Sequence, residues 1–286
     1  MPTGKSSMQG KICMVTGANS GIGKATALAL AQMGATVVMV CRDRARGEQA
    51  RSEITTKSKN NAVDLLQADL SSQQSIRQLV EHFQHHYTHL HVLINNAGAA
   101  FPRRRETVDG LEMTLAVNYL APFLLTHLLL DVLKASAPAR VVNVSSGSHE
   151  AGYIKLDNLQ SKNPYGSMKV YGQAKLAVVL FTYELARRLE GTGVTVNCLH
   201  PGFVATHFGQ RDVGPAFRLL VKVIGSFGTS PAKGAKTSLY LASSPKVEGV
   251  TGNYFVKSIP RRSASISYDE SLQRQLWEQS AKLVNL

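Results

Sequence analysis

The chain has 286 residues, of which 44% are hydrophobic, and this is enough to bury one sizeable core, so we expect a single domain over residues 1–286. Its formal net charge of +13 suits nucleic acid, an anionic membrane surface or an anionic small ligand. The basic residues are dispersed and are not interleaved with aromatic ones, which argues against nucleic acid.

Short apolar runs alternate with helix-like segments along most of the chain. Strands are predicted at residues 12–16, 36–41, 63–68, 92–95, 140–145 and 194–199. Helices are predicted at residues 23–33, 48–57, 72–85, 111–134 (with an irregularity at Pro122) and 170–190, and a shorter one at 270–283 within a polar tail, residues 258–286. Continuous apolar strands alternating with helices predict an α/β fold: a doubly wound parallel sheet of Rossmann type with helices on both faces.

The chain lacks the patterns of a disulfide framework, a zinc site, a signal peptide or a membrane span. Cys13, Cys41 and Cys198 are isolated within apolar runs, so we expect buried free thiols and no metal. Residues 1–10 are polar, and no uninterrupted apolar run reaches the roughly 18 residues of a membrane span. These features predict a soluble, cytoplasmic protein.

A glycine-rich turn, Thr16-Gly17-Ala18-Asn19-Ser20-Gly21-Ile22-Gly23, joins the first predicted strand to the first helix. Glycines let the backbone approach a pyrophosphate closely, and a helix N-terminus supplies N–H groups and positive potential. The turn therefore predicts a dinucleotide site with contacts from Gly17, Asn19, Ser20, Gly21, Ile22 and Gly23.

The end of the second strand bears on the choice of cofactor. NAD enzymes usually place an acidic residue about 20 residues after the glycine turn, to hold the ribose 2′-hydroxyl. Here Cys41 stands at the strand end and Arg42 follows, with a guanidinium suited to a 2′-phosphate. The sequence therefore favours NADP(H). Two alternatives stay open: Asp43 could hold the ribose of NAD(H), or Arg42 could merely pair with Asp43 or solvent.

Tyr171 and Lys175 are four residues apart on a predicted helix, and Ser146 ends the fifth strand. A free tyrosine has a pKa near 10, and a cation one helical turn away stabilises its anion. A serine hydroxyl can hydrogen-bond to a substrate oxygen as charge develops there. This set predicts proton transfer at a carbonyl or alcohol; Ser145 and Ser148 are nearby alternatives for the serine.

Tyr165 and Lys169 have the same spacing as the predicted catalytic pair. Pro164 and Gly166 predict a loop at that point, so a shared helix face is not expected there. Tyr171, which opens the long helical pattern, is the favoured tyrosine.

Taken together, these motifs resemble the short-chain dehydrogenase/reductase family over residues 11–255. Its motifs are matched by Thr16 to Gly23, Asn95-Asn96-Ala97-Gly98, the Ser146/Tyr171/Lys175 set, and Pro201-Gly202. Segments most similar to its retinol dehydrogenase branch are Cys41-Arg42-Asp43, Asn118-Tyr119-Leu120, Asp157-Asn158-Leu159-Gln160 and Leu176 to Leu189. The gap between Ser146 and Tyr171 is longer than in many members, and retinol-dehydrogenase-like members share this length.

The resemblance implies roles that the residues alone do not give. Asn118 becomes a fourth catalytic residue that holds a proton-relaying water, Lys175 binds the nicotinamide ribose, and Tyr171 exchanges a proton with the substrate oxygen. Further cofactor contacts are implied for Asp69, Leu70, Asn95, Ala97, Gly98, Pro201, Gly202, Val204 and Thr206. From the residues alone, Asp69 could be only a helix cap and Asn95 only a turn residue.

The substrate side is less specific. By resemblance, residues 207–229 form a lid whose apolar side chains suit a small apolar carbonyl or alcohol such as a retinoid, a steroid or another lipid aldehyde or ketone; they could equally just cover the sheet. His149 and Tyr153 are candidate pocket residues. Most of the histidines at positions 82, 85, 86, 89, 200 and 207 are expected to be solvated. Family members often form dimers through helices such as 111–134 and 170–190, so a homodimer is one expectation, and peripheral membrane contact is another.

The competing function is a catalytically silent NADP(H)-binding sensor.

Overall fold

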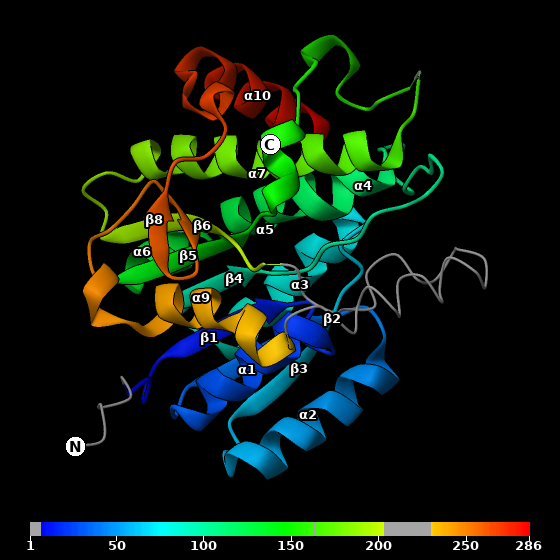
Figure 1. Cartoon of the computed structure of the whole chain (residues 1–286). Helices are drawn as coiled ribbons and strands as arrows, with labels where there is room; N and C mark the ends of the chain where they lie inside the picture. Colours follow the sequence, from blue (N-terminus) through cyan, green and yellow to red (C-terminus); the bar gives the residue numbers. More distant parts are fainter. Residues whose placement is uncertain (1–6, 163, 203–229) are drawn as a thin grey trace.

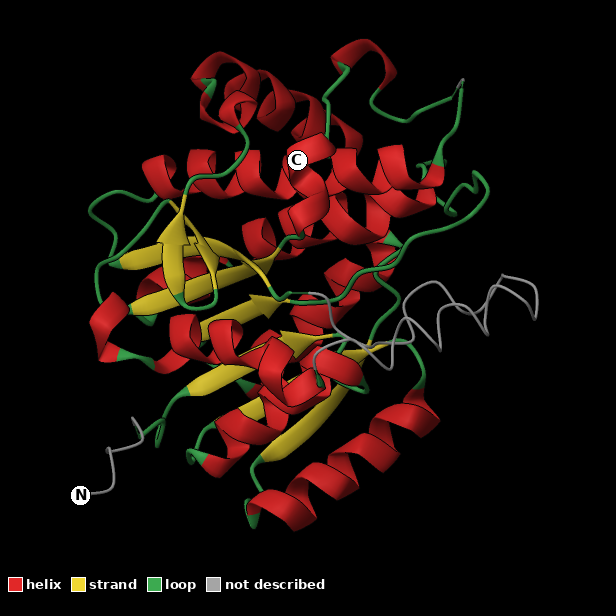
Figure 2. Cartoon of the chain, viewed as in Figure 1, coloured by secondary structure: helices red, strands yellow, loops and turns green. Residues whose placement is uncertain are grey.

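The computed structural model describes residues 7–162, 164–202 and 230–286 and contains one eight-stranded sheet (Figures 1 and 2). Its strands are β1 (Ile12–Thr16), β2 (Thr36–Cys41), β3 (Val63–Gln67), β4 (Val92–Asn95), β5 (Ala139–Val144), β6 (Val194–His200), β7 (Asn253–Val256) and β8 (Ile259–Arg261). The strand order is β3-β2-β1-β4-β5-β6-β7-β8, parallel throughout except for the antiparallel β7–β8 pair. The chain reverses its winding direction between β1 and β4, so the predicted doubly wound sheet is confirmed.

Helices cover both faces of this sheet, and each face has its own apolar core (Figure 1). One face carries α1 (Gly21–Gln32), α2 (Arg44–Ser58) and α9 (Pro231–Ser243). The other carries α3 (Gln73–His86), α5 (Ala121–Leu128), α6 (Leu130–Ala135) and α7 (Ser167–Arg188), with α10 (Glu270–Leu283) packed outside α5 and α7. Short helical turns complete the chain: α4 (Met113–Leu115), η1 (Ala116–Leu120), η2 (Gly147–Ala151), η3 (Leu156–Asn158), η5 (Pro245–Val247) and η6 (Ser265–Tyr268).

Three elements near the C-terminal end were not predicted: α9, β7 and β8. Helix α9 does carry a sequence signal, because Ser230 caps the Lys233 amide and Pro231 occupies the first turn. Strands β7 and β8 are short. Their connection places Lys257 and Ser258 at positive φ, a conformation that neither residue type predicts from the sequence.

The predicted helix 111–134 is divided. Residues 116–120 form a π-helical turn, η1, and the chain breaks again between α5 and α6. Pro122 lies in the first turn of α5 and has no N–H to donate to the carbonyl of Asn118, four residues earlier. The expected irregularity is therefore present, and it falls on the turn that contains Asn118.

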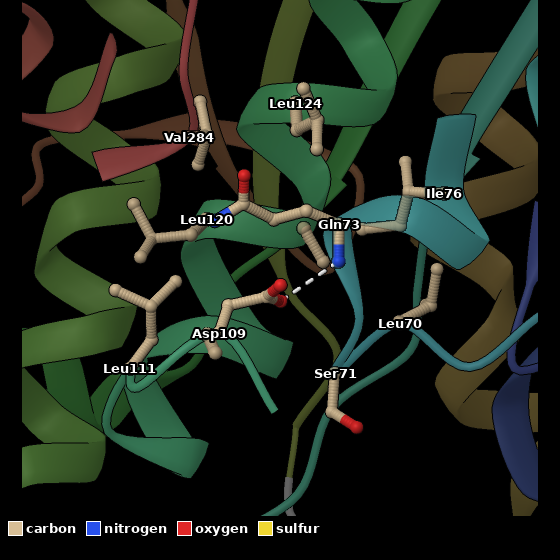
Figure 3. Close-up of a pocket in the computed structure, with 11 residues that line it drawn as sticks. Leu70, Ser71, Gln73, Ile76, Asp109, Leu111, Leu120, Leu124 and Val284 are labelled. Carbon is tan, nitrogen blue, oxygen red and sulfur yellow. Dashed lines mark hydrogen bonds between the residues drawn. The ribbon is translucent and has the colours of Figure 1, made fainter. Parts of the chain in front are cut away.

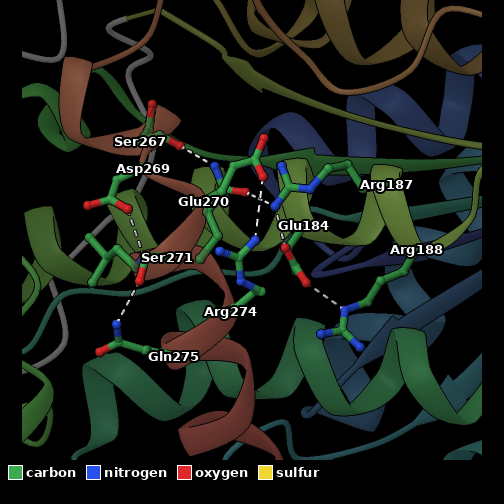
Figure 4. A network of polar contacts seen from close by, with 11 residues as sticks. Glu184, Arg187, Arg188, Ser267, Asp269, Glu270, Ser271, Arg274 and Gln275 are labelled. Carbon is green, nitrogen blue, oxygen red and sulfur yellow. Dashed lines mark hydrogen bonds and ion pairs between the residues drawn. The ribbon is translucent and has the colours of Figure 1, made fainter.

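The C-terminal helix α10 is joined to α5 and α7 by ring contacts and by charge. The Trp277 ring lies 5.1 Å from that of Phe123 and 5.9 Å from that of Phe181, and the Arg188 guanidinium stacks 4.1 Å from its centroid. Within α7, the buried carboxylate of Glu184 pairs with Arg188 and with Arg187 (Figure 4), and Arg187 donates to the side-chain oxygen of Gln273 on α10. Helix α10 is thus an integral layer of the fold.

No helix within the described ranges is long and apolar enough to cross a bilayer.

We predict that Trp277→Ala lowers the free energy of unfolding by about 2–3 kcal/mol, because the substitution leaves a cavity between α10 and the α5–α7 layer. Urea unfolding followed by circular dichroism measures the loss. Trp277→Phe, which keeps a ring at this position, should lose less than about 1.5 kcal/mol. An unchanged midpoint in Trp277→Ala would show that α10 contributes little to stability.

Candidate active site

The turn between β1 and α1 forms a cradle of backbone that only glycine allows. Gly17 and Gly21 have φ of +67° and +54°, and a Cβ on Gly17 would lie 3.0 Å from the Cα of Ala97. A Cβ on Gly23 would collide with the carbonyl oxygen of Gly17. Ser20 caps α1 without a side-chain hydrogen bond, and the first turn holds no acidic residue. The amides of this helix start therefore remain suited to an anion.

The β1 turn is tied to the β4 turn through Thr16 and Asn96. The hydroxyl of Thr16 accepts from the amides of Asn96 (2.9 Å) and Ala97 (3.0 Å), and the Asn96 side chain donates to the Thr16 carbonyl (2.8 Å). These contacts bring the Asn95–Gly98 motif against the glycine cradle. Thr16 and Asn96 lay within the predicted motifs, but their linking role has no separate sequence signal.

Asn95 is buried and holds β4 against its neighbours. Its amide group donates to Thr126 (3.0 Å) and to Asn143 on β5 (2.8 Å), and Asn143 donates to Thr182 on α7 (3.0 Å). Its side chain therefore stabilises the sheet, and the turn-residue alternative does not describe it. Asn143 and Thr182 were not anticipated.

The residues after β2 take distinct positions. Asp43 is the N-cap of α2: its carboxylate accepts from the Arg46 amide (3.1 Å) and lies 3.6 Å from the Arg46 guanidinium. Arg42 is more than half exposed and approaches Asp69 loosely, with 3.9 Å between Nη1 and Oδ2. Arg42 thus pairs with Asp69, so the Asp43 pairing considered for it is wrong.

Asp69 and Leu70 follow β3. The Asp69 carboxylate accepts from the amide (2.9 Å) and hydroxyl (2.7 Å) of Ser71, while Ser72 caps α3. The helix-cap alternative for Asp69 is therefore wrong. The Leu70 side chain lines an apolar recess with Ile76, Leu111, Leu120, Leu124 and Val284 (Figure 3).

Ser146, Tyr171 and Lys175 come together where β5 ends against α7. Tyr171 and Lys175 are 8% and 3% exposed, and the Lys175 ammonium lies 5.7 Å from the centroid of the Tyr171 ring. Lys175 Nζ donates to the Val144 carbonyl (3.0 Å). The Tyr171 and Ser146 side chains share a hydrogen bond.

Burial controls the protonation of this pair. It raises the pKa of Tyr171 to about 12, although the hydrogen bond with Ser146 acts in the opposite direction. Burial also lowers the pKa of Lys175 to about 8. The expected lowering of the Tyr171 pKa by Lys175 is therefore wrong for the protein without a bound ligand, because loss of hydration dominates both groups.

The serine alternatives are separated by their partners. Ser145 is buried, and its hydroxyl donates to the Lys175 carbonyl (2.8 Å), so it joins β5 to α7. The Ser146 hydroxyl accepts from the Ser148 amide (3.2 Å) and also reaches Tyr171. Ser146 is the serine that contacts the tyrosine.

Asn118 lies beside this group on the η1 turn and is almost fully buried. Its side chain donates to the carbonyls of Ala99 (2.6 Å) and Thr114 (2.8 Å) and accepts from the Ala99 amide (3.2 Å). A Cβ on Gly98 would lie 2.8 Å from the Asn118 oxygen and 3.4 Å from Lys175 Nζ. Gly98 thus lets Asn118 and Lys175 approach each other, and π turns of this kind are frequent at functional sites.

Tyr165 lies outside the site. It precedes α7, its hydroxyl donates to the Phe101 carbonyl (2.9 Å), and burial raises its pKa. Lys169 is exposed on α7. The second tyrosine–lysine pair therefore does not form a buried acid–base group.

Two histidines near the site are withdrawn from solvent. His149, a candidate pocket residue, is fully buried, and His200 is partly buried. Tyr153 is 64% exposed. Burial of a histidine by residues from the far end of the chain has no local sequence signal.

The segment after β6 is described in part. Pro201 and Gly202 follow the strand, and Gly202 has a φ of +85°, so this turn requires glycine. Val204, Thr206 and the expected lid at residues 207–229 lie outside the described residues. Among the residues that are described, no three His, Cys, Asp or Glu side chains form a group suited to a metal ion.

Known proteins are similar to this chain in sequence and in fold. The family model described as short chain dehydrogenase matches residues 11–213. The chain is 44% identical over 297 residues to retinol dehydrogenase 14 from Homo sapiens, covering 98% of this chain and 88% of the relative. A crystal structure of an uncharacterised protein from Mycobacterium paratuberculosis has a TM-score of 0.80 at 30% identity and covers 98% of this chain and 96% of that one.

The Pseudomonas aeruginosa RhlG/NADP active-site complex is also similar, with a TM-score of 0.68 at 26% identity over 87% of this chain and 95% of that one. The family model and the high identity to a curated relative agree with the motifs and the sheet order. The protein belongs to the short-chain dehydrogenase/reductase family, in its retinol-dehydrogenase-like branch.

Proposed function

We propose that the protein is an NADP(H)-dependent oxidoreductase that interconverts an apolar alcohol and its carbonyl compound, with Tyr171 as the acid or base. The observation that carries this proposal is the buried contact of Tyr171 with Ser146, beside Lys175 and at the same edge of the sheet as the glycine cradle. A bound nicotinamide supplies or accepts the hydride in such a reaction.

The residues of the chain handle the proton. With its pKa raised to about 12, Tyr171 carries its proton at neutral pH and can donate it to a carbonyl oxygen. The Ser146 hydroxyl donates a hydrogen bond to the same oxygen as negative charge develops there. Lys175 replaces the lost proton on Tyr171, aided by Asn118, whose side chain holds the adjacent backbone at Ala99.

Preference for NADP(H) rests on two neighbouring side chains. Asp43 is engaged as the cap of α2, whereas the guanidinium of Arg42 is more than half exposed and only loosely paired with Asp69. Arg42 is thus available for a 2′-phosphate. The RhlG neighbour binds NADP. Gly17, Asn19, Ser20, Gly21, Ile22 and Gly23 hold the pyrophosphate, and Asp69, Leu70, Asn95, Ala97, Gly98, Pro201, Gly202, Val204 and Thr206 complete the cofactor contacts.

The substrate class is inferred from relatives. The name of the relative points to retinol, and we propose an apolar alcohol or aldehyde of that kind; the segment 207–229, expected to form the lid, lies outside the described residues. Cytoplasmic location and a homodimer stay predictions. A homodimer through α5 and α7 would form on a face where α10 already packs, and sedimentation analysis decides between monomer and dimer.

We predict that Tyr171→Phe lowers the turnover of NADPH with apolar aldehydes by about 10²–10⁴-fold, because the proton donor is removed, while NADPH still binds. Absorbance of NADPH measures turnover, and fluorescence titration measures binding. Tyr165→Phe is the matched control and should lose less than about tenfold. NADPH binding without turnover of any substrate by the wild-type protein would favour the silent sensor.

We predict that Arg42→Ala raises the KM for NADPH by about 10–100-fold and changes the KM for NADH much less, since one charge-assisted bond to the 2′-phosphate is lost. Arg51→Ala, which removes an exposed arginine paired with Glu48 on α2, is the control. Equal effects on both cofactors, or a wild-type preference for NADH, would contradict the assignment.

We predict that Lys175→Met abolishes most activity yet stabilises the fold by about 1–3 kcal/mol at pH 7. Lowering of the Lys175 pKa from 10.5 to about 8 means that the buried ammonium opposes folding below pH 8, and this cost disappears as the pH rises towards 10.5. Urea unfolding at pH 7 and pH 10 should show the stability gap shrinking. Lys169 is exposed on the same helix, so Lys169→Met is the control and should change the free energy of unfolding by less than about 0.5 kcal/mol. A Lys175→Met protein that is less stable than the wild type at pH 7 would contradict the prediction.

A further inference from the structure

The turn that follows Ser146, η2, is fixed by the ring of His149. Nδ1 of this ring lies 2.7 Å from the carbonyl oxygen of Ser146, and Nε2 lies 3.2 Å from the backbone nitrogen of Ala264. The ring is fully buried and packs on Tyr254 of β7 with 4.7 Å between centroids. His149 therefore joins the serine of the site to a segment 115 positions later in the chain.

The partners of the ring determine its protonation. A carbonyl oxygen can only accept, so Nδ1 carries a hydrogen; an amide N–H can only donate, so Nε2 carries none. His149 is therefore neutral and in one tautomer. Doubly protonated His149 would direct an N–H at the N–H of Ala264, and that contact would be lost.

The far end of this link is itself held in place. Next to Ala264, the hydroxyl of Ser263 bonds to Tyr183 on α7 (2.6 Å) and to Ser267 (2.6 Å). The side-chain amide of Gln273 on α10 donates to the Ser267 carbonyl (2.7 Å), and Arg187 donates to the oxygen of the same side chain. The Ala264 amide is thus a fixed donor supported by α7 and α10.

We propose that neutral His149 is a positioning residue for Ser146, which it anchors to the C-terminal segment through Ala264. This inference rests on the proposed function, in which Ser146 contacts the substrate oxygen. His149 itself has no exposed surface and acts through the backbone of Ser146.

Anchoring of this kind depends on pH. The ionisable side chains at the ring are Glu150 in its own turn, His200 on β6 and Tyr254 on β7. Burial lowers the pKa of His149 from 6.5, although the Ser146 carbonyl and Glu150 act in the opposite direction. The neutral ring therefore contributes its full anchoring above pH 6.5, and this is lost as the pH falls through the lowered pKa.

Two substitutions at this position separate the two contacts. In His149→Asn the side-chain amide takes the place of Nδ1 and keeps the bond to Ser146; in His149→Gln it takes the place of Nε2 and keeps only the bond to Ala264. Each variant breaks the link between Ser146 and Ala264, so we expect kcat for aldehyde reduction at pH 7.5 to fall about tenfold in both, with the KM for NADPH unchanged. The wild-type decrease of kcat below pH 6.5 should be absent from both variants.

His91→Asn is the control, because His91 also has a lowered pKa and accepts a backbone amide, from Ile12 at the other end of the sheet. It should leave kcat and its pH profile unchanged. Wild-type kcat in His149→Gln, or an acid limb that persists in both His149 variants, would overturn the proposal.

A measurement without substrate keeps the proposal separate from the proposed function. Nitrogen-15 NMR of the wild-type imidazoles at pH 7.5 should show His149 neutral with its hydrogen on Nδ1, whether or not the protein reduces any aldehyde. A hydrogen on Nε2 would refute the anchoring. If NADPH is never consumed but the tautomer is as expected, the proposed function fails while the anchoring of the Ser146 turn stands.

Discussion

The site depends on one residue that is bonded to the end of β5 at both its backbone and its side chain. The carbonyl of Lys175 accepts from the Ser145 hydroxyl, and its ammonium donates to the Val144 carbonyl. These two bonds set the register of α7 against the sheet. Tyr171, one helical turn earlier, therefore meets Ser146, the next residue of the same strand end.

Short-range features of the site could be predicted from the sequence. The i, i+4 spacing of Tyr171 and Lys175 and the backbone demands of Gly17 and Gly23 are local, so each follows from a few neighbouring residues. The same holds for the parallel strands, whose apolar runs are continuous.

Other features depend on contacts between distant residues and could not be predicted. Burial of Asn95 against Asn143 requires the pairing of β4 with β5, and loss of hydration at Tyr171 and Lys175 requires the packed interior. The four-residue spacing indicated that Tyr171 and Lys175 would interact. The direction of the Tyr171 pKa shift, however, depends on how completely burial removes water from its hydroxyl. His149 could not be distinguished from a surface histidine without knowing that Ala264 lies beside it.

The contact between His149 and Ala264 also has a consequence for biosynthesis. The glycine cradle and its β4 partner strand lie within the first hundred residues, whereas the support of Ser146 is completed by a segment close to the C-terminal end. Because chains emerge from the ribosome N-terminus first, the turn after Ser146 cannot be completed until residue 264 has been synthesised. The support of Ser146 is therefore among the last contacts that a newly made chain can form.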